Sequence, residues 1–132
     1  MLRVAFLPSD FNPMLLMLGE PADLRALSYV LRRFAHEGGE TRLDELASVA
    51  AMRTRVTLSG GDGPIGLYPL PGTEGAFIWR LDPERAVAFA EQIDGLAVPS
   101  RVSGSELLES TTVEEIPVKV SRGEYTDDFL SR

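Results

Sequence analysis

The chain of 132 residues contains no cysteine, a single lysine and a single histidine. Without cysteine there is no disulfide framework, no thiol nucleophile and no thiolate zinc site. A Ser-His-Asp or histidine–metal arrangement would depend on His36 alone, and no serine stands in the glycine-flanked context of a nucleophile elbow. The sequence therefore predicts no catalytic residue, no metal site and no cofactor, and we expect a protein that is not an enzyme.

Long hydrophobic runs are also missing. The longest apolar stretch, residues 14–18, has the size of a strand, whereas a membrane helix needs about 20 apolar residues. The N-terminal segment turns acidic and is broken by proline too early for a secretory signal. We therefore expect a cytoplasmic protein that does not bind a membrane.

Positive charge is in deficit. Twenty Asp and Glu residues against 13 Lys and Arg residues give a net charge of −7. Phosphate backbones are bound by basic surfaces, so we expect no nucleic-acid binding. An acidic surface instead favours a partner protein with a basic face, because opposite charges steer the two together.

Two helices are predicted from apolar stripes and from capping residues. The first covers residues 19–37, where Pro21 suits the first turn and apolar residues recur every three or four positions. The second follows Asp82, whose side chain can cap a helix that begins at Pro83. The charged residues 80–85 are then explained as the join between a strand and a helix.

Strands are predicted where apolar residues alternate or cluster between turn signals. They cover residues 2–6, 14–18, 53–59, 64–70, 76–81 and 116–120. Residues 41–52 fit either a short helix or a strand. The glycine-rich turn at residues 60–63 predicts a hairpin between the strands on either side of it. Prolines 64 and 69 place the second of these strands at a sheet edge.

These elements define the expected fold class as α+β. The order β-β-α-β-β-β-α-β predicts a mostly antiparallel sheet of five to six strands with two helices packed on one face. The length and composition predict a single domain, residues 1–132, that ends in an acidic C-terminal tail, residues 122–132.

The acidic edge before the last strand and the acidic tail are the predicted binding surface, because aromatic residues beside charges are typical of protein interfaces. The predicted partner-binding residues are Glu114, Glu115, Glu124, Tyr125, Asp127, Asp128 and Phe129. One alternative is a small-ligand or metal-binding domain, or an enzyme, with a pocket near Trp79, Arg80 and the turn at residues 8–13. Another is a homo-oligomeric structural protein, and a specific homodimer also fits the proline-bearing edge strand.

Three segments carry a resemblance to a known group of proteins. They are GEPADLRALSYVLRRFA (19–35), FIWRLDPERAVAFAEQIDGLA (77–97) and IPVKVSRGEYTDDF (116–129). With the N-terminal hairpin, they resemble a group of small, largely uncharacterised bacterial α+β proteins, some of which are immunity proteins of polymorphic toxin systems. The resemblance supplies no catalytic residue. It implies a non-catalytic inhibitor that binds a bacterial toxin, and this is the function that we expect.

Overall fold

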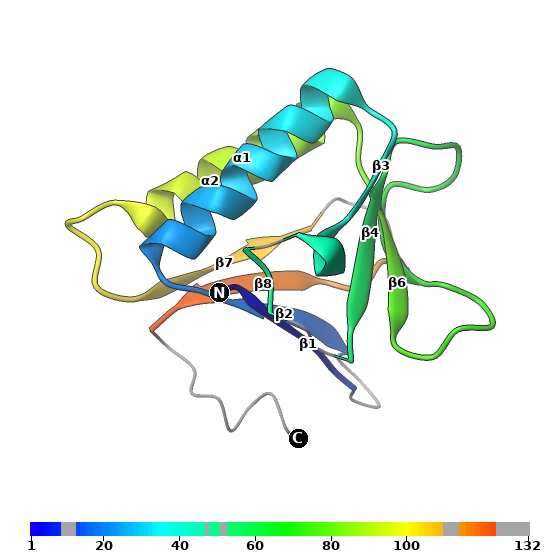
Figure 1. Cartoon of the computed structure of the whole chain (residues 1–132), viewed down its shortest axis with the longest axis horizontal. Helices are drawn as coiled ribbons and strands as arrows, with labels where there is room; N and C mark the ends of the chain where they lie inside the picture. The colour runs from blue at the N-terminus through cyan, green and yellow to red at the C-terminus, as the bar shows by residue number, and fades with distance from the viewer. Residues whose placement is uncertain (9–12, 47, 51–52, 110–113, 124–132) are drawn as a thin grey trace.

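The strands of this protein form two sheets. The computed structural model describes residues 1–8, 13–46, 48–50, 53–109 and 114–123. Within them the order is β1 (Arg3–Leu7), β2 (Met14–Leu18), α1 (Pro21–Glu37), β3 (Glu40–Arg42), a 3₁₀ turn (Leu43–Glu45), β4 (Arg55–Ser59), β5 (Gly66–Pro69), β6 (Ala76–Arg80), α2 (Pro83–Ala97), β7 (Gly104–Leu108) and β8 (Val118–Arg122). The first sheet has the strand order β1-β2-β8-β7 and the second β3-β4-β6-β5 (Figure 1).

The α+β class is confirmed, but the prediction of one mostly antiparallel sheet of five to six strands is wrong. Each four-stranded sheet is mixed, since its outer pairs are antiparallel and its central pair is parallel. β2 lies beside β8, with Leu15 opposite Val118, and β4 lies beside β6, with Arg55 opposite Ala76. Turn signals report only pairings between neighbouring segments, and so they could not reveal either parallel pair.

The hairpin expected across residues 60–63 does not form. β6 lies between β4 and β5, so the loop after β4 crosses over to the outer strand of the second sheet. β5 pairs with β6 instead, across the turn at residues 70–75. The predicted edge position of β5 is confirmed, and β2 lies in the interior of its sheet.

Two other segments differ from the expectation. Residues 41–52, where described, are neither one helix nor one strand: β3 ends at Arg42, a 3₁₀ turn follows, and Val49 forms a parallel bridge with Leu2. The sequence analysis missed β7, because its residues Gly104–Leu108 lack a clear apolar alternation. β7 lies at the outer edge of the first sheet, where such a pattern is not required.

The two halves of the chain repeat one arrangement of hairpin, helix and hairpin. The first half contains β1 to β4 around α1, and the second contains β5 to β8 around α2. Each sheet takes one hairpin from each half. The helices correspond at a spacing of 62 positions: the buried residues Leu24, Leu27, Leu31 and Phe34 of α1 match Ala86, Phe89, Ile93 and Leu96 of α2.

Local signals explain where both helices begin and where α1 ends. Asp82 Oδ1 accepts a hydrogen bond of 2.7 Å from the backbone N–H of Arg85, which confirms the predicted cap of α2. α1 has a capping box between Glu20 and Asp23. It ends at Gly38, whose φ of 70° is accessible to glycine without strain. The join at residues 80–85 is therefore a structural device, as the sequence indicated.

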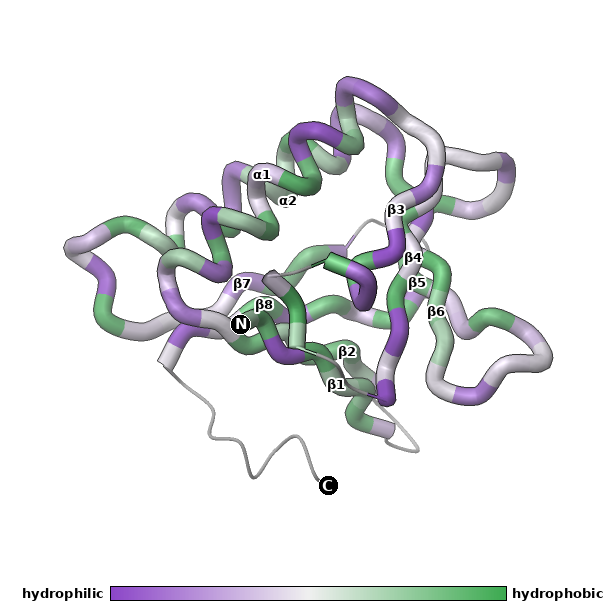
Figure 2. Tube along the Cα trace, viewed as in Figure 1, coloured by the Kyte–Doolittle hydropathy of each residue, from purple (hydrophilic) through white to green (hydrophobic). Residues whose placement is uncertain are grey.

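The helices and both sheets enclose one hydrophobic core. α1 and α2 lie side by side and antiparallel above the first sheet, with the second sheet at one end (Figure 1). Hydrophobic and hydrophilic residues alternate along both helices, as in amphipathic helices with one buried face (Figure 2). Trp79 lies in this core, where its ring stacks on Phe89 at 5.9 Å between centroids. In the described part of the chain neither helix has the length and apolar character that a bilayer crossing requires.

Candidate functional site

Two of the seven predicted partner-binding residues lie in the described part of the chain. Glu114 is exposed and Glu115 is half-buried, just before β8. The side chain of Glu115 lies against Gly66 at the edge of the second sheet, and Ile116 N–H donates to the carbonyl of Leu67. The other five, Glu124, Tyr125, Asp127, Asp128 and Phe129, lie outside the described residues. The structure therefore places the first two at the β5 edge and leaves the tail as a prediction.

The alternative site around Trp79 loses its central element. Trp79 is only 1% exposed, so its ring is part of the core and not the wall of an open pocket. Arg80 is half-buried, with its guanidinium beside Gly63. Of the turn at residues 8–13, which was the third part of this predicted site, residues 9–12 lie outside the described residues. A ligand therefore cannot reach the indole without opening the core.

His36 is exposed in the last turn of α1. In the ranges that the structure describes, no group of three or more His, Asp and Glu side chains is placed to hold a metal ion. Within these ranges the His36 side chain forms no hydrogen bond or ion pair, so nothing in its surroundings orients it as a general base.

The outer face of the second sheet carries arginines around a hollow of about 280 Å³. Arg42 already forms ion pairs with Asp44 at 3.0 Å and Glu45 at 2.9 Å. An adjoining hollow places Glu74 beside Arg53 and Arg55. Because acidic groups accompany these guanidinium groups, the face has no clear excess of positive charge with which to hold an anion.

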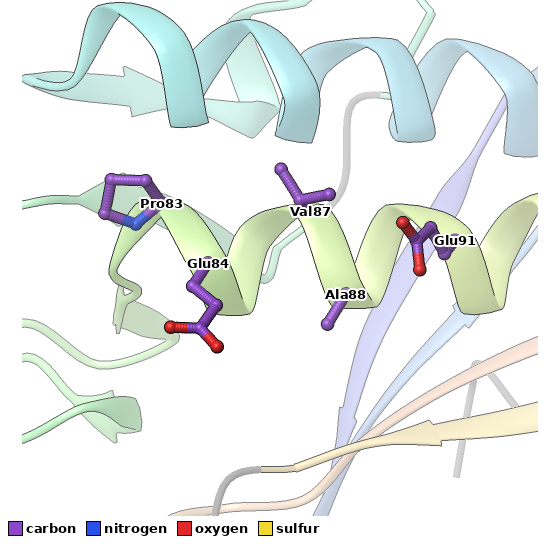
Figure 3. Close-up of a pocket in the computed structure, with 5 residues that line it drawn as sticks. All are labelled: Pro83, Glu84, Val87, Ala88 and Glu91. Atoms are coloured by element: carbon purple, nitrogen blue, oxygen red, sulfur yellow. The ribbon is translucent and has the colours of Figure 1, made fainter.

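A groove on α2 is the better candidate. A shallow, open hollow of about 500 Å³ lies over the exposed face of the helix and is lined by Pro83, Glu84, Val87, Ala88 and Glu91 (Figure 3). Pro83 and Val87 project toward α1, whereas Glu84 and Ala88 project to the opposite side of α2 (Figure 3). A second hollow of about 220 Å³, lined by Asp82, Glu84, Arg85 and Ala88, adjoins the first. We call the two together the α2 groove.

The α2 groove combines negative charge with apolar contact area. Glu84 and Glu91 are both exposed, and seven positions place them on one face of the helix about 10.5 Å apart along its axis. Within the described chain neither glutamate forms an ion pair with another residue. Ala88 lies between them and leaves room for an incoming side chain. Chemically, the groove suits a cationic segment that also carries an apolar or aromatic group.

The sequence analysis missed this site although its signal was present. Positions 84, 88 and 91 recur at helical spacing on the polar side of α2. Only the opposite, buried stripe of that helix was used to predict structure. Comparison with protein-family models, with curated proteins and with solved structures finds no match to this chain. The candidate site therefore depends on geometry and charge alone.

Proposed function

We propose that this chain is a non-catalytic protein-binding domain that holds a basic segment of its partner in the α2 groove. The observation that carries the proposal is the pair of exposed glutamates, Glu84 and Glu91, on either side of an apolar hollow of about 500 Å³. Carboxylates at this spacing can pair with two cationic side chains, while Val87 and Ala88, which line the same hollow, supply apolar surface for the carbon atoms of those side chains.

The net charge of −7 supports the same partner chemistry, because it raises the rate of encounter with a basic protein at low ionic strength. An immunity-type inhibitor of a bacterial toxin is the concrete form of this proposal. It retains the basic partner that the composition favours and moves the contact from the tail to α2. The acidic tail, residues 122–132, is then an additional contact at most.

The test is affinity capture from lysate of the native host, carried out in parallel with the wild-type chain and a charge-reversed variant. We expect Glu84→Arg/Glu91→Arg to lose a stoichiometric partner that the wild-type chain captures, since two attractive contacts become repulsive. Bound proteins are identified by mass spectrometry. A variant with truncation after Gly123 shows whether the tail contributes.

The matched control is Asp62→Arg/Glu74→Arg, which makes the same change in net charge on two exposed loop acids away from α2. This control should keep the partner. If both variants lose it equally, net charge is responsible and the α2 groove is not the site. If the α2 variant keeps the partner, the proposal is wrong.

A further inference from the structure

The two helices have matching buried faces but opposite outer faces. At the spacing of 62 positions, Arg25 of α1 corresponds to Val87 of α2, Tyr29 to Glu91, and Arg33 to Gly95. The exposed side of α1 is therefore basic and aromatic, whereas the exposed side of α2 is acidic. The repeated fold places these two surfaces next to each other on one layer of the molecule (Figure 1).

The exposed side of α1 has the chemistry that the α2 groove requires. Its cationic residues are Arg25, Arg32 and Arg33. Tyr29 is 64% exposed among them, which is unusual for a large aromatic side chain on a monomer surface. Tyrosine and arginine are the residues most often found at the energetic centre of interfaces.

We infer that the partner in the α2 groove is α1 of a second copy of this chain. This inference rests on the proposed function, since it concerns the same groove, and it replaces the toxin as the occupant of that groove by a second copy of the chain. A twofold axis that runs parallel to the helices, between α1 and α2, sets each α1 over the α2 of the other copy. Each contact then occurs twice, as in any isologous dimer.

In this dimer Tyr29 of one copy lies in the hollow beside Ala88 of the other, and the arginines of α1 lie against Glu84 and Glu91. Arg25, like both glutamates, forms no ion pair within the described residues, so its charge is available to a second copy. Arg33 is held only weakly, by Glu37 at 3.9 Å. The other in-plane twofold axis, perpendicular to the helices, would set α1 on α1 and bring like charges together.

The size of the helical layer sets the strength that we expect. Helices of 17 and 15 residues are about 26 and 22 Å long, and two adjacent helices are about 20 Å wide. The contact area that a layer of these dimensions offers lies at the low end for specific protein interfaces. The dimer should therefore be reversible and sensitive to salt.

The experiment is sedimentation velocity on the full chain from about 5 to about 500 µM, a range that brackets a dissociation constant on the order of tens of micromolar. At low salt we expect the mass to rise with concentration from 14.4 kDa toward twice that value. In about 1 M NaCl, where the Debye length is about 3 Å, the rise should largely disappear. A chain that stays monomeric at low salt throughout this range overturns the inference.

Two charge-reversed variants test the surface. An acidic variant, Arg25→Glu/Arg33→Glu, carries negative charge on both helices, and a basic variant, Glu84→Arg/Glu91→Arg, carries positive charge on both. Each alone should be monomeric because its two faces repel those of a second copy. An equimolar mixture should regain the dimer mass, because each helix then meets the opposite charge. The variants change exposed residues only, and far-UV circular dichroism checks that they fold.

Tyr29→Ala should weaken dimerisation at least tenfold, whereas Asp62→Arg/Glu74→Arg should leave it unchanged. A mixture of the two reversed variants that stays monomeric contradicts the twofold arrangement.

Failure of this inference can be distinguished from failure of the proposed function. A monomeric chain whose captured partner still depends on Glu84 and Glu91 would retain the α2 groove as a site and exclude only the second copy as its occupant.

Discussion

Arg32 and Asp94 occupy equivalent positions on α1 and α2, 62 residues apart, and the two side chains contact each other. Arg32 Nη2 donates to Asp94 Oδ2 at 2.6 Å. Beneath this ion pair, Ser28 Oγ donates to the carbonyl of Ala90 at 3.4 Å, and these two residues are also equivalent. The helices of the two halves therefore meet through matching positions, with small residues inside and opposite charges outside.

The Arg32–Asp94 pair should contribute little to stability. Its side chains are 43% and 44% exposed, and exposed ion pairs are typically worth about 0.2–1 kcal/mol. A double-mutant cycle with Arg32→Ala and Asp94→Ala, followed by urea unfolding, should give a coupling energy in that range. In about 1 M salt the coupling should fall toward zero. A coupling above about 2 kcal/mol, the scale of a buried pair, would contradict this prediction.

Loss of the α2 cap should have a larger effect. Asp82→Ala removes the side-chain acceptor of the Arg85 N–H, and the free energy of unfolding should fall by about 1 kcal/mol. Chemical denaturation measures the change. Asp62→Ala, an exposed acid in a loop, serves as control and should change stability by less than about 0.5 kcal/mol. Equal effects of the two substitutions would show that the cap contributes nothing specific.

Gly66 should tolerate alanine less well than Gly72. Both have positive φ, 127° and 82°, so a side chain at either position is strained. A Cβ at Gly72 would meet no atom within 4 Å, whereas a Cβ at Gly66 would lie 2.7 Å from the Cβ of Glu115. Rotation of the Glu115 side chain cannot remove this contact, because the Cβ of Glu115 is fixed by the backbone. Thermal unfolding should therefore show a lower Tm for Gly66→Ala than for Gly72→Ala, and the reverse order would refute the contact.

Trp79 should act as a reporter of folding and not of ligand binding. Its ring is 1% exposed and stacks on Phe89, so we expect blue-shifted emission with little quenching by iodide until the chain unfolds. Trp79→Ala should lower the free energy of unfolding by about 3–5 kcal/mol through the cavity that it leaves. Strong iodide quenching of the native protein would place the ring at the surface, contrary to the structure.

The parts of the fold that could be predicted are those with local causes. Leu24, Leu27 and Leu31 recur at helical spacing, Asp82 caps α2, and residues 14–18 are apolar on both faces because β2 is interior. Each of these signals is contained within one segment. Both helices and the strands other than β3 and β7 therefore followed from the sequence.

The division into two sheets could not be predicted, because it depends on pairing between distant strands. Leu15 lies opposite Val118, and nothing near either residue identifies the other. The turn residues at 60–63 have the composition of a hairpin, yet tertiary contacts place β6 between the two flanking strands. The composition indicated a loop at these residues, but it did not show which strand pairs with β4.

The candidate site shows the same limit in another form. The acidic residues of the tail were easy to identify because they lie close together in sequence. Glu84 and Glu91 are separated in sequence and share a face only once the helix has formed. The helical spacing of the two glutamates is visible in the sequence. The hollow around Ala88, which makes them a candidate site, is visible only in the structure. A sequence shows which residues share a helix face and does not show whether that face is hollowed.

The exchange of hairpins between the two halves has a consequence for how the chain can be divided. Because each sheet takes one hairpin from each half, a cut in the loop at residues 60–65 leaves two fragments, neither of which contains a complete sheet. The fragments can complete each other only by folding together, and a single half could find its missing hairpins in a second copy of itself. The covalent link between the halves raises the effective concentration of each half for the other. The chain can therefore be divided at the exposed loop into two fragments that need each other to complete both sheets.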